Sequence, residues 1–528
     1  MASTTYSTPG VYINEVNAFA QSVVPIATAV PAFIGYTPRA DYKGKSYYNK
    51  AQKITSFMDF QAFYMLDDPL PPADPARQYS PEYYLVAQKT VPTSGEYMSI
   101  NGLYYSILPD TSTIYYLYNS VRLFYLNGGG DAYIVSVGPA NGPASKKPMT
   151  DPSLDPVNPN VHLADLERGL ALLMNEEEPT MYICPEATLL SAADNSTLME
   201  SMLLQAGQMR TALCIFDIIG GGNPDPILYL QDIQSFRNST GNTSLDFGTS
   251  YYPFIGTTIM QSGDIDFTNL FNGDIAQLGA LLNPPSAPDP VIASILSMIQ
   301  TPPANPMTNG QLHAALLVAS PLYAQIVTHV LACANVLPPS GAIAGVYTVN
   351  DNSNGVWGAP ANVGIVGAVS LPIRLSDKQQ EPLNIDALSG KSVNAIRFFN
   401  GQGILIWGAR TLDGNSQDWR YISVRRTMTF LEQSIKLSAR EYVFEPNTAN
   451  TWSAVKSMIS SFLMGVWSEG GLQGAKPEDA FQVSVGLGTT MTADDLLNGY
   501  MRVTVLVATV KPAEFVVITF QQEQAKSG

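Results

Sequence analysis

The stretch from residue 500 to residue 522 constrains the fold most, because it carries two apolar strand patterns separated by a proline. Residues 501–510 and 513–520 are both rich in Val, Ile, Thr and Phe, which favour a pleated, half-buried surface. Pro512 has no N–H group and a fixed φ, so the two runs are not one central strand. An apolar run this close to a polar end needs a sheet edge, either in its own domain or in another copy of the chain.

The other end of the sequence carries a similar pattern. A short strand pattern follows the turn signal Thr8-Pro9-Gly10 and has little local sequence to pair with. We therefore predict an N-terminal arm with the first strands in residues 1–35, and a C-terminal arm in residues 511–528. The arm strands consist of Val11, Tyr12 and Ile13 at one end and of Glu514, Phe515, Val516, Val517, Ile518 and Phe520 at the other.

The middle of the chain predicts more than one domain, since 528 residues exceed a single core. Residues 126–256 alternate strand and helix patterns, which indicates a layered α/β domain with a mostly parallel sheet. Residues 312–350 return to that domain, beginning with one long apolar helix over residues 311–335. Residues 351–510 mix helices with antiparallel strands and predict a C-terminal α+β domain. The expected fold class is thus a multidomain α/β and α+β protein with strand arms at both ends.

Two segments interrupt these patterns. Residues 36–125 are rich in Tyr and Pro and include Asn101-Gly102, a type I′ hairpin signal. Residues 257–311 contain three proline clusters. Turn-rich insertions of this kind are tolerated on surfaces, so we expect loops or small lobes on the outer face.

Composition excludes several classes of function. Charged residues make up 14% of the chain against a usual ~25%, and the net charge is −16, which argues against a basic face for nucleic acid or anionic membrane. No apolar run reaches ~18 residues, and no basic segment followed by an apolar one opens the sequence, so a cytosolic product without a signal peptide or membrane span is expected. Cys184, Cys214 and Cys333 are far apart and predict free buried thiols.

The sequence predicts no catalytic, cofactor-binding or metal-ligating residue, and therefore no enzyme. His162, His313 and His329 are isolated, and no H-E-x-x-H, C-x-x-C or G-x-S-x-G pattern occurs. The glycine triplets at 128–130 and 220–222 precede no lysine, so they are read as turns rather than phosphate loops.

The order of several motifs resembles the sheath proteins of contractile injection systems, which include phage contractile tails. The motifs are YSTPGVYINEV, TAVPAFIG, VLPPSGAIAGVY, GVWGAPANVGI, NAIRFFNGQGILIWGARTL, RYISVRRTMTFLEQSIK, SFLMGVWSEGGLQG and KPAEFVVITF. They run from one end of the chain to the other, whereas the two insertions carry no recognised motif and their roles stay open.

This resemblance implies a structural role. Copies of the chain would stack as six-membered rings around an inner tube, exchange their terminal strands, and contract to drive the tube through a target envelope. The implied partners are the chain itself, the inner tube protein, and baseplate and cap proteins, with no cofactor, nucleic acid or membrane insertion. Assembly is expected in the bacterial cytoplasm, as part of a phage tail or of a tail-like particle that is released or membrane-anchored.

One further candidate and two alternatives remain open. Thr492 is predicted to cap a short helix whose first turn holds Asp494 and Asp495. These acids either contact the inner tube or only serve the helix dipole. The alternative functions are a hydrolase on a subtilisin-like α/β domain and another self-assembling tail or shell protein.

Overall fold

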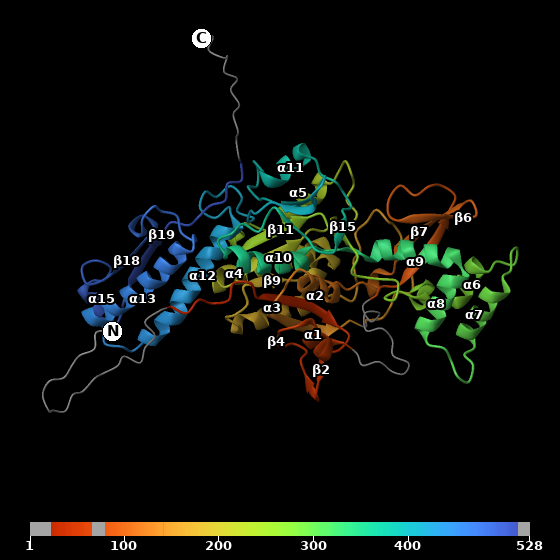
Figure 1. The fold of residues 1–528 in the computed structure, drawn as a ribbon, viewed down its shortest axis with the longest axis horizontal. Coiled ribbons are helices and arrows are strands. Elements are labelled where there is room, and N and C mark those ends of the chain that lie inside the picture. The colour runs from red at the N-terminus through yellow and green to blue at the C-terminus, as the bar shows by residue number, and fades with distance from the viewer. Residues whose placement is uncertain (1–22, 66–79, 141, 516–528) are drawn as a thin grey trace, which may run out of the picture. The chain divides into compact units, whose positions relative to one another are not determined.

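The computed structural model describes residues 23–65, 80–140 and 142–515, and it divides the chain into two compact units (Figure 1). The α/β unit comprises Ala27–Phe430 and Lys511–Gly528, and the C-terminal unit comprises Met1–Ile26 and Leu431–Val510. The two units are described in turn.

The described residues of the α/β unit form a nine-stranded mixed sheet. From edge to edge its strands are β14 (Val363–Gly364), β17 (Gly403–Trp407), β16 (Asn394–Phe399), β11 (Gly248–Tyr252), β10 (Leu213–Asp217), β9 (Met181–Ile183), β1 (Pro31–Thr37), β8 (Ala132–Pro139) and β4 (Ala51–Ile54). The six strands from β16 to β8 are parallel to their neighbours, while β14, β17 and β4 pair antiparallel. This confirms the predicted parallel-type sheet.

The order in which the chain adds parallel strands to the sheet reverses between β1 and β9. The chain runs from β1 to β8 on one side and then continues through β9, β10 and β11 on the other. Every residue of β1 is buried, as expected of a strand covered on both faces. Such a reversal creates a crevice at the carboxyl ends of the strands, where open α/β sheets bind ligands.

Helices cover both faces of this sheet. Neighbouring residues of a strand point to opposite faces. The ring of Phe33 lies 5.6 Å from that of Phe124 in α2 (Leu117–Leu126), which packs with α10 (Ser340–Asn354). Ile34 instead faces Gly169 of α3 (Leu163–Leu172), where a Cβ atom would come within 2.8 Å of the isoleucine. Glycine is thus required for α3 to approach the sheet, beside α4 (Ala192–Met209) and α5 (Leu230–Ser239).

The α/β unit extends further along the chain than the sequence indicates. We expected residues 351–510 to form one C-terminal domain, but β14, β16 and β17 belong to the large sheet, and the unit boundary falls inside α12 (Ile422–Ala439). Tyr251 and Tyr252 of β11 pair in parallel with Asn394 and Ala395 of β16. Because the paired strands are so far apart along the chain, no local pattern in the sequence indicates their pairing.

The two expected insertions contribute to the core as well as to the surface. Of residues 36–125, β4 is an edge strand of the large sheet and α2 is almost fully buried, whereas β5 (Tyr83–Gln88), β6 (Tyr97–Ile100) and β7 (Leu103–Pro109) form a separate sheet. Asn101 and Gly102 both have positive φ, which confirms the type I′ hairpin. Residues 257–311 hold α6 (Ile275–Leu282) and α7 (Pro290–Gln300), and Ile265 and Leu270 are fully buried.

The single helix expected over residues 311–335 is wrong. The structure has two helices, α8 (Asn309–Ala319) and α9 (Pro321–Ala334), bent by 115°. Pro321 lacks an N–H group and sits at the first position of α9, with Ser320 as its cap. Only this bent pair has the length and hydropathy of a membrane span, and no single helix in the described ranges does.

The remaining elements of the α/β unit are short. They are α1 (Phe57–Tyr64), β2 (Asp41–Tyr42), β3 (Lys45–Ser46), β12 (Ile255–Thr257), β13 (Val336–Leu337), β15 (Ala368–Ser370), α11 (Asp377–Asn384) and the 3₁₀ turns η2 (Thr111–Thr113), η3 (Leu173–Asn175), η4 (Pro185–Leu189), η5 (Leu245–Phe247), η6 (Phe267–Asn269) and η7 (Phe271–Gly273). Cys184 and Cys214 are buried and Cys333 is partly exposed, and all three are free thiols.

The C-terminal unit is a small α+β structure. Its elements after α12 are η8 (Arg440–Tyr442), α13 (Ala449–Ser468), α14 (Pro477–Ala480), β18 (Phe481–Val485), α15 (Ala493–Leu497) and β19 (Val503–Val507). Helix α13 packs against β18, and its buried face includes Val455, Ile459 and Phe462. Helices α12 and α13 and the antiparallel pair β18–β19 are the mixture of helices and strands that the sequence predicts.

Two buried carboxyl groups of the α/β unit predict a pH dependence of stability. Asp217 accepts hydrogen bonds from the backbone and hydroxyl of Ser340, and Glu186 accepts one from the backbone of Leu117. Burial raises the pKa of each group to about 7. The folded state therefore binds more protons than the unfolded state between about pH 4 and pH 7, so stability falls as pH rises through this interval. We expect a higher melting temperature at about pH 5 than at about pH 8.

The matched variant for this test is Asp217→Asn, which should flatten part of the slope. The self-repulsion of a chain with net charge −16 also lowers stability as pH rises. Repeating the melts at high salt screens this repulsion and leaves the effect of the buried groups. A melting temperature that rises from the acidic to the basic buffer would contradict the expected sign.

Candidate functional site

The described end of the C-terminal arm is held by the carboxylate of Glu514. Arg410 donates from Nε to Oε1 at 2.9 Å and from Nη2 to Oε2 at 2.6 Å. Asn384 Nδ2 donates to Oε1 at 2.8 Å, and the Tyr421 hydroxyl donates to Oε2 at 3.3 Å. The side chains of Arg410 and Glu514 are 4% and 20% exposed. A bidentate ion pair that is largely excluded from water fixes the position of Glu514 on the α/β unit.

Arg410 follows β17 and is held through its backbone. The side-chain amide of Asn394 in β16 accepts from the Arg410 N–H at 2.8 Å and donates to the Arg410 carbonyl at 2.8 Å. The hydroxyl of Thr249 in β11 donates to the same carbonyl at 3.0 Å. Strands β11 and β16 therefore fix the backbone of Arg410 without any contribution from the C-terminal arm.

The ion pair stays charged over a wide pH range. Burial works to raise the pKa of Glu514, but hydrogen bonds from Arg410 and Asn384, together with the arginine charge, outweigh it. The pKa of Glu514 is thus below its usual value. Because the folded-state pKa of this acid is depressed, its contribution to stability is present above the unfolded pKa and is lost only as pH falls through the folded value.

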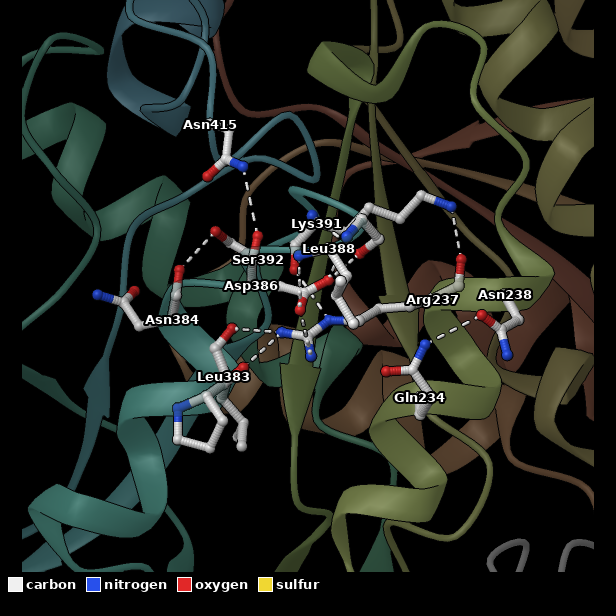
Figure 2. A network of polar contacts seen from close by, with 12 residues as sticks. Gln234, Arg237, Asn238, Leu383, Asn384, Asp386, Leu388, Lys391, Ser392 and Asn415 are labelled. Carbon is white, nitrogen blue, oxygen red and sulfur yellow. Dashed lines mark hydrogen bonds and ion pairs between the residues drawn. The ribbon is translucent and has the colours of Figure 1, made fainter.

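Asn384 belongs to a polar network that supports this anchor (Figure 2). Arg237 of α5 donates to the carbonyls of Pro382, Leu383 and Lys391 at 2.7–3.0 Å. Its Nη1 atom lies 3.9 Å from Asp386, and Ser392 donates to the Asn384 carbonyl at 2.7 Å. The last turn of α11, which carries Asn384, is therefore held by Arg237 and Ser392.

In the single chain, Glu514 and Phe515, which were predicted as the start of the arm strand, lie in no strand, and Phe515 is 67% exposed. Their pairing with another copy of the chain stays a prediction. The pairing of Glu514 with Arg410 was missed, although a single acid in an apolar run is a recognisable signal. The other predicted arm residues lie outside the described ranges: Val11, Tyr12, Ile13, Val516, Val517, Ile518 and Phe520.

The C-terminal unit presents an open two-stranded hairpin. Strands β18 and β19 pair antiparallel from Phe481–Val507 to Val485–Val503, and among the described residues neither strand joins a third. Isolated two-stranded sheets are marginally stable, and unpaired edges accept further strands. The hairpin therefore offers two edges to which a strand can be added.

The short helix α15 carries the predicted acidic pair. Thr492 caps the helix as predicted, and its hydroxyl accepts from the backbone of Asp495 in a capping box. The carboxylate of Asp495 accepts from the backbone and hydroxyl of Thr492 and from Arg502, at 2.9 Å each. Asp495 is thus committed to its own helix, whereas Asp494 and Leu497 are exposed.

The residues considered for catalysis occupy separate places. Ser340 is fully buried and donates to Asp217 at the start of α10. His313 bonds to Tyr323 at 2.8 Å, and His329 to Glu96 at 2.6 Å. No group of three metal-ligating side chains occurs in the part of the chain that the structure describes.

Residues 415–523 match the family described as the phage tail sheath C-terminal domain. The tail sheath protein of Vibrio phage KVP40 is 30% identical over 139 residues, which are 26% of this chain and 20% of that protein. The tail sheath protein of Enterobacteria phage T4 is 27% identical over the same length. The matched region therefore spans about a fifth of the length of these curated relatives.

Two solved structures are similar over nearly the whole chain. The contracted sheath complex of an extracellular contractile injection system, PVC, is 25% identical with a TM-score of 0.57, covering 98% of this chain and 99% of that chain. A chain of the anti-feeding prophage baseplate is 25% identical with a TM-score of 0.55, covering 98% and 100%. The similarity thus includes both units and both candidate insertions.

Proposed function

We propose that this chain is the sheath subunit of a contractile injection system, and that it polymerises as stacked hexameric rings around an inner tube. Contraction of the rings drives the tube through a target cell envelope. The observation that carries this proposal is the similarity over 98% of the chain to a sheath in its contracted state. The similarity of this chain to a chain of a baseplate structure supports baseplate contact. The net charge of −16 argues against nucleic-acid binding.

Electron microscopy of the purified chain tests this function. The sheath subunit should form hollow, striated tubes of stacked rings, and coexpression with the cognate inner tube protein should give longer tubes with a filled lumen. Discrete particles that never extend along an axis, at any concentration, would contradict the proposal and favour another shell or tail role.

The terminal arms supply the connection between subunits in this proposal. The anchor at Glu514 holds the base of the C-terminal arm on its own α/β unit, and residues 516–520 continue to the β18–β19 edge of a neighbour. Each main-chain hydrogen bond of such an added strand contributes ~0.5–1.5 kcal/mol. The N-terminal strand of Val11, Tyr12 and Ile13 adds to the other edge. Because each arm is anchored on its own subunit and its strand pairs with a neighbour, the rings can move while the subunits stay connected.

The contact with the inner tube is proposed at α15. Asp494 is exposed, whereas Asp495 is used by its capping box, so Asp494→Lys should weaken tube binding without unfolding the helix. The double change of Asp494 and Asp495 to Lys should uncouple sheath from tube and also cost the cap about 1 kcal/mol. Copurification of tube with sheath is the measurement.

Asp495→Asn is the matched control for this prediction, because it keeps a capping side chain and leaves Asp494 in place. It should retain the tube. If Asp494→Lys also retains the tube at the wild-type ratio, the two acids serve only their helix, and the tube contact lies elsewhere.

A further inference from the structure

A cavity of about 390 Å³ lies in the α/β unit beyond the carboxyl ends of β9 and β10. It is lined by Thr188 after β9, Gly220 after β10 and Asn119 of α2. This is the edge at which open α/β sheets bind ligands, next to the reversal between β1 and β9. A cavity of this volume matches small-molecule sites of roughly 300–1,000 Å³.

The acidic residues that line the cavity favour a positively charged ligand. Its ionisable carboxylates are Asp155 and Glu96, and no Lys, Arg or His occurs among its described lining residues. Glu96 is already bonded to His329, whereas no cation acts on the pKa of Asp155, and only the backbone of Gly220 favours its charged form. Burial raises the pKa of Asp155, as expected of a carboxylate without a cationic partner. Phosphate is therefore excluded, although the glycine triplet 220–222 borders the cavity.

A buried acceptor among the residues that line the cavity lacks a hydrogen-bond partner. Asn119 is 3% exposed, its Nδ2 atom donates to the Met260 sulfur at 3.5 Å, and its Oδ1 atom has no hydrogen bond. An unsatisfied buried acceptor costs ~1–3 kcal/mol. A ligand that brings an N–H donor to this atom removes that cost.

Aromatic side chains also line the cavity. The rings of Tyr116 and Phe254 meet edge to face at 6.3 Å, and Tyr83 also lines the cavity. The negative faces of aromatic rings attract ammonium groups within ~6 Å of a ring centroid. The same rings provide apolar surface for a carbon stem.

We propose that this cavity binds a primary ammonium ion on a short aromatic or aliphatic stem. The ammonium group donates to Asn119 Oδ1 and to the carboxylate of Asp155, and the stem packs against Tyr116 and Phe254. The site is independent of sheath assembly, so its test uses the unassembled full-length chain.

Calorimetric titration with three probes tests the site: 2-phenylethylammonium, 2-phenylethanol and 3-phenylpropionate, which share a stem but differ in head group. The cation should bind with one site per chain and raise the melting temperature, and the alcohol and the anion should not. Asp155→Asn and Asn119→Leu should each weaken binding about tenfold, the loss of one charge-assisted hydrogen bond.

Asp151→Asn is the matched control, since Asp151 is exposed and outside the cavity lining. It should leave binding unchanged and so separate the site from diffuse attraction to an acidic chain. Circular dichroism confirms that each variant is folded. Equal affinity for all three probes, equal losses in all three variants, or no heat with the cation would each overturn the proposal.

Discussion

A chain that ends at Phe515 is expected to fold and melt like the full-length protein but to form no sheath. This truncation keeps the ion pair between Glu514 and Arg410 and removes only the proposed exchanged strand. The body of the subunit should keep its melting temperature, because the contacts described here are intact. Sheath formation should be lost completely, since each ring loses a set of main-chain hydrogen bonds worth ~0.5–1.5 kcal/mol apiece. Circular dichroism, sedimentation and electron microscopy measure the three outcomes.

A second truncation, after Lys511, separates the anchor from the strand. It also removes Glu514 and leaves the 4% exposed guanidinium of Arg410 without its carboxylate, which should cost about 3 kcal/mol of unfolding free energy. Full-length Glu514→Gln should lose part of this stability. If the chain ending at Phe515 melts as low as the one ending at Lys511, the strand belongs to its own domain. If it assembles normally, arm exchange is refuted.

The second large effect is expected for Asp351→Asn, which should destabilise the α/β unit by about 3–5 kcal/mol. Asp351 accepts two hydrogen bonds from Arg426 at 2.6 and 2.8 Å, and the two side chains are 3% and 4% exposed. Arg426 also donates to the Thr28 carbonyl at 2.8 Å and lies 4.7 Å from the centre of the Tyr347 ring. Removing the carboxylate charge leaves a guanidinium in a site that water does not reach.

Denaturant unfolding measures this effect, with Asp131→Asn as the matched control. Asp131 pairs with Lys53 at 2.9 Å, but the two side chains are 45% and 35% exposed, so its loss should cost less than about 1 kcal/mol. Similar costs for Asp351→Asn and Asp131→Asn would show that the buried pair contributes no more than a surface pair.

Local patterns in the sequence predicted the elements that local physics decides. Asn101 and Gly102 take the positive φ values that a type I′ turn demands, and Thr492 caps its helix as the sequence indicates. The amphipathic patterns of α12 and α13 likewise needed no tertiary information. Pro321 was the exception, because its fit at the first position of a helix was overlooked and one helix was predicted for two.

Long-range contacts account for what the sequence could not reveal. The parallel pairing of β11 with β16 joins residues that are far apart in the chain. Strand β16 was expected in the C-terminal domain but belongs to the large sheet. The same holds for the anchor: the Arg410 and Glu514 side chains are 104 residues apart, so no local pattern in the sequence pairs them. The arms as exchange strands stay a prediction, since their apolar residues lie outside the described ranges.

The return of the chain to its first unit has a consequence for synthesis. Residues 27–430 of the α/β unit leave the ribosome as one continuous stretch, before the C-terminal unit and before Lys511. Arg410 is translated 104 residues ahead of Glu514, an interval of about 5–20 s at common elongation rates. During that interval the nascent unit holds an unneutralised guanidinium. The ion pair between Arg410 and Glu514 therefore forms only once the C-terminal unit has been made, so the C-terminal arm is anchored at the end of synthesis.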